Sequence, residues 1–147
     1  VKRWGRNSRL DNIQAAILSY KLKKYEKVIE RRREVAQMYH DKLNHLEELK
    51  LPPKPDDDKE RFDVYQNYEL HCDKRDELKD YLNQNGIGTL VQWGGMAIHQ
   101  FKDLGFNQEC PKTDYFFDRC IMLPMNVFIS NDDIDYISQK IIEFYRP

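Results

Sequence analysis

The 147-residue sequence has little of what marks several common protein classes. Its three cysteines, Cys72, Cys110 and Cys120, form no C-x-x-C pair, which argues against a disulfide framework or a structural zinc site. No apolar run is long enough to cross a bilayer, and no signal peptide is visible at the start. With 24 basic and 25 acidic side chains the net charge is −1, so neither nucleic acid nor a membrane is expected as a partner. We therefore expect a cytoplasmic protein with reduced thiols and no bound metal.

Residues 9 to 46 carry apolar side chains at helical spacing, without proline or glycine, and predict one long helix. The apolar stripe changes sides near Lys21 to Lys24, which indicates a kink or two abutting helices. Ser8 is the expected N-cap, with Asp11 three residues later completing a capping box. The basic run Arg31-Arg32-Arg33 is interleaved with glutamates at ion-pairing spacing. A solvated helix face is therefore favoured over a nucleic-acid surface.

Residues 47 to 147 show shorter alternating and helical patterns after an exposed Pro- and Asp-rich loop at 51–60. The acidic run in that loop is read as solvent-facing rather than as a metal site, because consecutive carboxylates do not converge without a scaffold. Ser130 and Asp133 are expected to cap the last helix, and Asp73 an earlier one at 74–84. The remaining expected elements are strands at 62–72, 88–93 and 121–123, a turn at 96–101, and a helix at 111–120. This order predicts an α+β fold, a long N-terminal helix plus a small sheet covered by helices.

The opening segment places two polar side chains, Asn7 and Arg9, beside a helix N-terminus, where an anion can bind. An ordinary capped helix that binds nothing is the alternative. The segment resembles the signature of the DegT/StrS-type sugar aminotransferases, which are pyridoxal-phosphate enzymes acting on nucleotide-linked keto sugars. The likeness is carried by Gly5-x-Asn7-x-Arg9-Leu10-Asp11-x-x-Gln14-Ala15-Ala16-x-Leu18.

Further stretches resemble other blocks of that family, in the same order along nearly the whole chain. They include Arg33-x-x-Ala36-x-x-Tyr39, Tyr65-x-x-Tyr68, Gly86-Ile87-Gly88-Thr89, Pro111-x-Thr113-Asp114 and Leu123-Pro124-Met125. The resemblance implies the C-terminal small domain of a fold-type-I pyridoxal-phosphate enzyme, over residues 1–147. Residues 1–46 would form the long linking helix or kinked helix pair, and residues 47–147 the α+β layer.

The resemblance also implies roles for particular residues. Asn7 would meet the phosphate of pyridoxal 5′-phosphate in the neighbouring subunit of a homodimer formed through the Gly5-Asn7-Arg9 region. Arg9 would face the substrate at the same pocket. His99 is kept from the family's Pro-x-Pro-Leu-His stretch, although both prolines are lost, and Trp93 takes the aromatic place. Both would contact the substrate; a surface helix residue is the alternative for His99, and core or interface packing for Trp93.

No stretch resembles the family's segment with the Schiff-base lysine, so no catalytic residue is expected in this chain. We expect the large cofactor domain to lie upstream and the chain alone to be inactive. The complete enzyme would transfer an amino group, from glutamate, to a nucleotide-linked keto sugar for polysaccharide or glycan precursor synthesis. Two alternatives stay open: a pyridoxal-phosphate-dependent deoxysugar dehydratase of the same family, and a non-catalytic helical interaction module.

Overall fold

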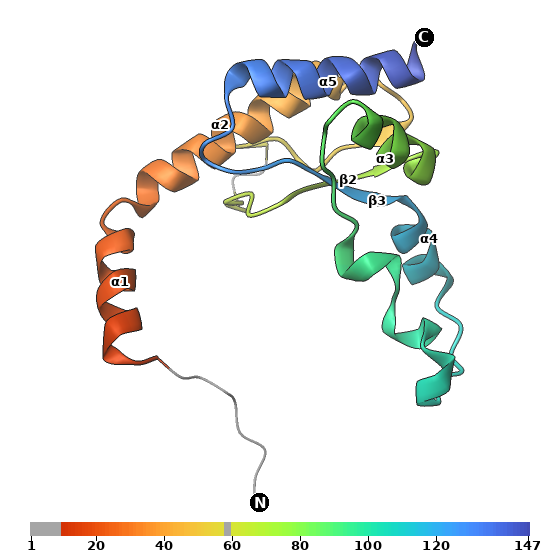
Figure 1. Cartoon of the computed structure of the whole chain (residues 1–147), viewed down its shortest axis with the longest axis horizontal. Helices are drawn as coiled ribbons and strands as arrows, with labels where there is room; N and C mark the ends of the chain where they lie inside the picture. The colour runs from red at the N-terminus through yellow and green to blue at the C-terminus, as the bar shows by residue number, and fades with distance from the viewer. Residues whose placement is uncertain (1–9, 58–59) are drawn as a thin grey trace, which may run out of the picture.

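The computed structural model describes residues 10–57 and 60–147, which form a small antiparallel sheet with helices packed against it (Figure 1). The sheet has the order β1-β2-β3, with β1 at Leu49–Lys50, β2 at Tyr68–Cys72 and β3 at Cys120–Leu123. The central strand β2 pairs antiparallel with both neighbours. Leu70 lies opposite Ile121 of β3, and Cys72 lies opposite Leu49 of β1. The predicted α+β architecture is therefore confirmed.

One face of the sheet carries the hydrophobic core. Side chains alternate along a strand, so Tyr68, Leu70 and Cys72 point to the same face, and all three are buried. This face is covered by α2 (Tyr25–Leu43), α3 (Arg75–Gln84) and α5 (Asn131–Tyr145), whose apolar stripes it buries. The helices contribute Val35, Ala36, Tyr39, Leu43, Leu78, Leu82, Ile134, Ile137 and Ile141 to the core.

The opposite face of the sheet is partly covered by α4 (Pro111–Arg119). His71 lies on this face by alternation, and its ring meets Phe116 of α4 edge-on, with the ring centroids 4.9 Å apart. The predicted helix at 111–120, strand at 121–123 and final helix are all confirmed. Ser130 and Asp133 form the expected capping box at the start of α5.

The predicted long helix is broken where its apolar stripe changes sides. α1 (Asn12–Leu22) and α2 meet at Lys23 and Lys24, so the kink is confirmed. The N-cap prediction was wrong: Asp11 caps α1 by accepting the Gln14 N–H at 2.8 Å, whereas Ser8 lies outside the described residues. α1 buries none of its residues and extends away from the sheet, leaving its apolar side chains exposed (Figure 1).

The three consecutive arginines of α2 are not a solvated face, contrary to the prediction. Arg31 donates to the Ile129 carbonyl at 2.7 Å, and Arg32 donates to the carbonyls of Tyr65 and Gln66 at 2.9 and 2.7 Å. Arg33 donates to the Asp63 carbonyl at 2.7 Å and pairs with Asp56. Each guanidinium thus bonds α2 to the backbone of a loop.

The predicted strand at 62–72 is shortened by a turn. Tyr65 has a left-handed backbone, with φ of 48°, and its N–H donates to the Asp63 side chain at 2.7 Å. Tyr65 is nevertheless buried, and its hydroxyl donates to the Pro53 carbonyl at 2.7 Å. Tertiary contacts therefore hold a bend that the alternating pattern did not reveal, and the short β1 was missed as well.

Two further expectations are corrected. Residues 88–93 form only one bridge, Leu90 to Met122, before the chain turns, so the second strand is not formed. Asp73 does not cap α3, because the N-cap position is occupied by Lys74 in a left-handed conformation. The Asp73 N–H instead donates to the Glu48 carbonyl at 3.1 Å. This bond extends the pairing of β1 with β2 by one residue.

We predict that replacing Arg32 by Met lowers the free energy of unfolding by about 1–3 kcal/mol, because two carbonyls lose a charged donor. Urea unfolding followed by circular dichroism measures this change. The control is Lys27→Met, which removes an exposed cation from the same helix and should leave stability within about 0.5 kcal/mol. Equal effects of the two variants would contradict the assigned role of Arg32.

Candidate functional site

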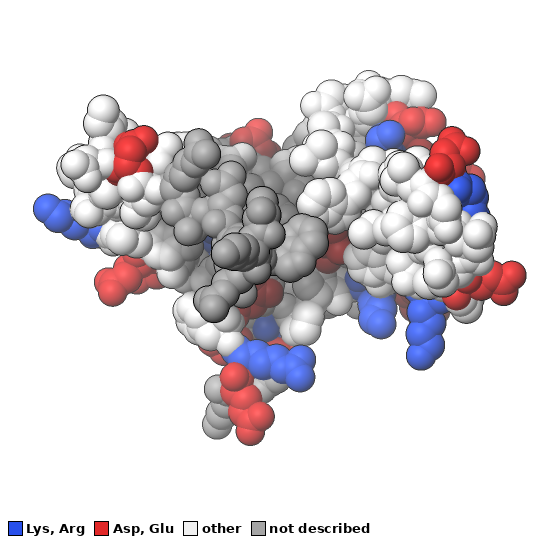
Figure 2. Space-filling view, turned by 90° about the horizontal axis from the view of Figure 1, so that it is seen from below, with Lys and Arg blue, Asp and Glu red and all other residues white. Residues whose placement is uncertain are grey.

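Leu90 bridges to β3, and the residues that follow it, 91–110, run to the start of α4. These residues form an arm that projects from the sheet on the side away from α5 (Figure 1). It consists of three short turns, η1 (Gln92–Gly95), η2 (Ile98–Gln100) and η3 (Lys102–Leu104). Seen from below, the lobe at this end of the molecule presents a largely uncharged face with ionic side chains at its rim (Figure 2). Trp93, Ile98 and Leu104 of the arm are each more than two thirds exposed.

A cavity of about 770 Å³ lies between the arm and α4. Its walls are mainly apolar and aromatic, which is common for sites that take small organic ligands. The cavity brings together two of the sequence-predicted site residues, Trp93 and His99. The full lining comprises Trp93, Met96, Ala97, Ile98, His99, Phe101, Phe106, Gln108, Cys110, Thr113 and Phe117.

His99 is held by a carboxylate that sequence reasoning did not select as a site residue. Its Nε2 lies 2.8 Å from Oδ1 of Asp114, on α4, and the His99 side chain is 11% exposed. The Gln100 amide donates to the same oxygen at 2.8 Å. Gln100 Oε1 in turn accepts the Ala97 N–H at 2.9 Å, so the network ties the η2 turn to α4.

The Asp114 carboxyl is ionised at neutral pH. Its hydrogen bond with His99 lowers its pKa below the usual value, with smaller contributions from Gln100 and the charge of Lys102. An ionised carboxylate only accepts hydrogen bonds, so His99 Nε2 must carry the proton in this pair. His99 is therefore neither an isolated surface residue nor a freely turning one.

Trp93 lies at the mouth of the cavity and is 77% exposed. Its backbone is left-handed, with φ of 52°, and Gly94 and Gly95 follow with φ of 69° and 78°. A proline, whose φ is fixed near −65°, cannot occupy the Gly95 position. The stretch that has lost a proline therefore has a backbone turn that a proline at Gly95 could not adopt. In this turn the indole of Trp93 faces solvent and is not part of the core.

Asn7 and Arg9, the other two sequence-predicted site residues, lie outside the described residues. Asp114 and Gln100 are the residues that sequence reasoning missed. Asp114 stands in the Pro111-x-Thr113-Asp114 block that resembled the family, and this was the available signal. A link from that block to His99 depends on the way the arm folds back, which no local pattern encodes.

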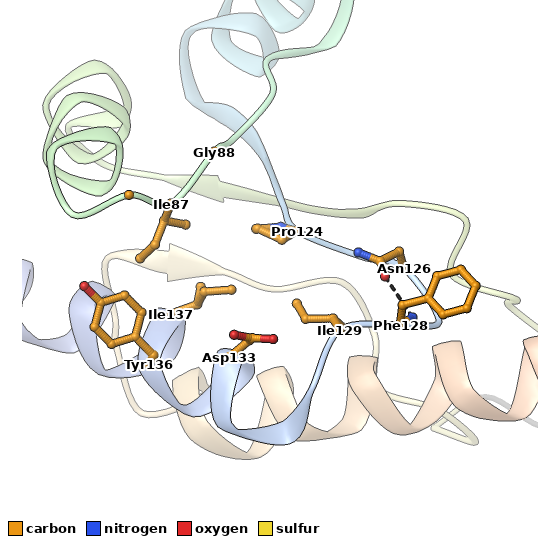
Figure 3. A pocket seen from close by; sticks show the side chains of 10 residues that line it. Ile87, Gly88, Pro124, Asn126, Phe128, Ile129, Asp133, Tyr136 and Ile137 are labelled. Carbon is orange, nitrogen blue, oxygen red and sulfur yellow. Dashed lines mark hydrogen bonds between the residues drawn. The ribbon is translucent and has the colours of Figure 1, made fainter.

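A second cavity, of about 480 Å³, lies between the turn after α3 and the start of α5 (Figure 3). Its polar groups already have partners: Asp133 accepts from Ser130, and the Tyr136 hydroxyl donates to the Asn85 carbonyl at 3.1 Å. In Figure 3 the side chains of Ile87, Ile129 and Ile137 point toward the space between these segments. No cationic side chain lines it, so it is poorly suited to a phosphate.

The linings of these two cavities do not by themselves fit pyridoxal 5′-phosphate. Neither cavity is lined by a lysine that could form a Schiff base, nor by an arginine that could hold the phosphate. Over the same residues, no cluster of three or more His, Cys, Asp or Glu could hold a metal ion. Among the helices described, none is long and apolar enough to cross a membrane. All three cysteines are free thiols, and Cys72 and Cys120 are buried.

Comparison with known proteins gives a consistent family. The model of the DegT/DnrJ/EryC1/StrS aminotransferase family matches residues 1–142. A pleiotropic regulatory protein from Geobacillus stearothermophilus is 35% identical over 147 residues, covering 97% of this chain. A dTDP-3-amino-3,6-dideoxy-alpha-D-galactopyranose transaminase from Aneurinibacillus thermoaerophilus is 30% identical over 140 residues, covering 93% of this chain.

Solved structures agree with the fold. A DegT/DnrJ/EryC1/StrS aminotransferase from Brucella abortus superimposes with a TM-score of 0.81 at 29% identity, over 99% of this chain and 38% of its own. An aminotransferase from Streptoalloteichus hindustanus has the same fold, with a TM-score of 0.84 at 23% identity, over 99% of this chain and 39% of its own. The chain spans 39% and 37% of the two curated relatives named above.

We predict that the Asp114 carboxyl titrates below its usual pKa of 3.8 in the folded protein. Because the folded-state pKa is depressed, the ionised group stabilises the fold above the unfolded pKa, and this contribution is lost as pH falls through the folded pKa. His99→Ala should raise the Asp114 pKa toward 3.8, as followed by carboxyl-carbon NMR during an acid titration. Asp133, whose pKa is lowered by Ser130, is the internal control and should not move. An unchanged Asp114 pKa in the variant would contradict the pairing.

Proposed function

The chain belongs to the DegT/DnrJ/EryC1/StrS aminotransferase family, and from this premise we propose that it is the C-terminal domain of a pyridoxal-phosphate-dependent nucleotide-sugar aminotransferase. The observation that carries the proposal is the family match over residues 1–142, together with a chain that spans 37–39% of two curated relatives. Residues 1–46 would serve as a kinked linking helix pair and residues 47–147 as the α+β layer.

In the complete enzyme an amino group would pass from glutamate to the keto carbon of a nucleotide-linked sugar. Pyridoxal phosphate would supply the amino-group chemistry, held by residues outside those described. The role of this chain is substrate contact: the arm offers an exposed indole, Trp93, and a fixed imidazole, His99, on one cavity. A flat aromatic face next to a polar group suits a sugar ring, which has apolar C–H faces and hydroxyl edges.

Asn7 is assigned to the cofactor phosphate of the partner subunit, and Arg9 to the substrate at the same pocket. Both assignments are what the resemblance of Gly5-x-Asn7-x-Arg9 to the family motif implies. They require a homodimer in which the opening segment of one protomer reaches the pocket of the other. Together with Trp93 and His99, they make the substrate pocket a composite of the opening segment and the arm.

The test is an assay of the complete protein with pyridoxal 5′-phosphate, glutamate and a dTDP-linked keto sugar. Mass spectrometry should find the amino sugar nucleotide, and a coupled assay should find one equivalent of 2-oxoglutarate. A product that has lost water without gaining an amine would favour the dehydratase. No product with any dTDP-, GDP- or UDP-linked keto sugar, and no retained cofactor, would favour the non-catalytic interaction module.

We predict that Asn7→Ala weakens cofactor retention by the complete protein by about tenfold or more, because a charge-assisted hydrogen bond to the phosphate is lost. The cofactor absorbance that remains after dialysis measures this. The matched control is Asn83→Ala, which removes an exposed amide on α3. If both variants keep the cofactor as the unsubstituted protein does, the assignment of Asn7 is wrong.

A further inference from the structure

We propose that Asp114 is a positioning residue that holds His99 in the Nε2–H tautomer, so that Nδ1 accepts a hydrogen bond from a sugar hydroxyl in the arm cavity. The identity of the ligand as a sugar rests on the proposed function. The tautomer itself rests on geometry alone, and it can be measured whether or not the enzyme transfers an amino group.

The first step is the direction of the hydrogen bond between the two side chains. Nε2 of His99 and Oδ1 of Asp114 are 2.8 Å apart, a normal length for a charge-assisted bond. An ionised carboxylate has no proton to give, so the donor is the imidazole. In the neutral ring only one nitrogen carries a proton, and a proton on Nε2 leaves the lone pair on Nδ1.

The second step is that the carboxylate is itself fixed. Asp114 lies in the first turn of α4, a helix that begins with Pro111. The Gln100 amide donates to the same Asp114 oxygen at 2.8 Å, and the Ala97 N–H orients Gln100 by donating to its Oε1 at 2.9 Å. Two linked hydrogen bonds, together with the helix, therefore define where the acceptor oxygen lies, and the imidazole bonds to it there.

The third step concerns what Nδ1 can meet. Within residues 10–57 and 60–147 the structure gives His99 Nδ1 no hydrogen-bond partner, while His99 lines the cavity. The walls around it are mostly apolar, with Trp93, Phe101 and Phe117 among them. His99 Nδ1 is not among the buried unpartnered polar atoms of the described residues, so it is open to the cavity and a ligand hydroxyl can reach it. An exposed indole on the same cavity suits the C–H face of a sugar ring. A hydroxyl-bearing ring meets both requirements.

The direct test is NMR of the complete protein labelled with ¹⁵N-histidine, recorded at alkaline pH. Loss of a signal in His99→Gln assigns it. In the unsubstituted protein Nε2 should show the protonated-type shift and Nδ1 the lone-pair-type shift. Asp114→Ala should mix the two tautomers, whereas Asp114→Glu should restore the Nε2–H form at least in part. A proton on Nδ1 in the unsubstituted protein, or no change in Asp114→Ala, would overturn the proposal.

The second part of the test uses dTDP-glucose and dTDP as ligand probes. Saturation with dTDP-glucose should shift the His99 Nδ1 signal, and dTDP should not, because it lacks the hexose hydroxyls. Equal shifts with both probes, or none with either, would overturn the hydroxyl assignment while leaving the tautomer result standing.

Kinetics then separate positioning from folding. In the complete enzyme, Asp114→Ala should raise the KM for the sugar nucleotide about fivefold to tenfold and leave the KM for glutamate unchanged. The control is Asp118→Asn, which alters an exposed carboxylate on the same helix that does not line the cavity. An unchanged sugar KM in Asp114→Ala would overturn the positioning role. Absence of transamination in the unsubstituted enzyme would count against the proposed function alone, since the NMR result does not depend on turnover.

Discussion

The apolar contact between α2 and the face of the sheet is the interaction on which the rest of the structure depends. Tyr39 of α2 and Tyr68 of β2 are both almost fully buried, with ring centroids 5.0 Å apart. The Tyr39 hydroxyl donates to the Pro124 carbonyl at 2.9 Å, at the end of β3. Burial raises the pKa of Tyr39, so this hydroxyl stays a donor throughout the physiological range. One side chain thus joins a helix to both the middle and the edge of the sheet.

Away from this core, polar bonds hold the peripheral segments in place. The arginines of α2 bond to loop residues at 56, 63–66 and 129–131. The arm is joined to the sheet by the Leu90–Met122 bridge and to α4 by the bonds of Asp114. The same helix that supports the arm also packs Phe116 against His71 on the sheet. The cavity is therefore fixed to the core through α4, which forms one wall, although most of its other lining residues belong to short turns and loops.

The spacing of apolar residues along the sequence correctly predicted the elements that are encoded within a few neighbouring residues. The stripes of α3 and α5, the buried strand β3 and the Ser130 cap were predicted correctly, because each is encoded by spacing within a few residues. The same reasoning failed at Tyr65, Lys74 and Trp93, where side-chain-bearing residues adopt left-handed backbones. Such conformations cost free energy locally and persist through distant contacts, as in the bond from the Tyr65 hydroxyl to the Pro53 carbonyl. The roles of the arginines and of Asp114 were hidden for the same reason, because their partners are distant in sequence or are backbone carbonyls.

In the arm, the backbone turn and the imidazole that follows it are held by different elements. Gly95, with φ of 78°, excludes proline, so this turn and a proline-bearing turn are different solutions for the same stretch of backbone. His99 follows the turn, but its imidazole is held from α4 by Asp114 rather than by the turn itself. Differences at residues 93–96 would therefore alter the apolar wall and the place of Trp93, while the imidazole stays in position as long as the bonds of Ala97, Gln100 and Asp114 are kept. The shape of the apolar wall depends on the turn, whereas the position of the His99 imidazole depends on Asp114 of α4. The two features can therefore vary independently.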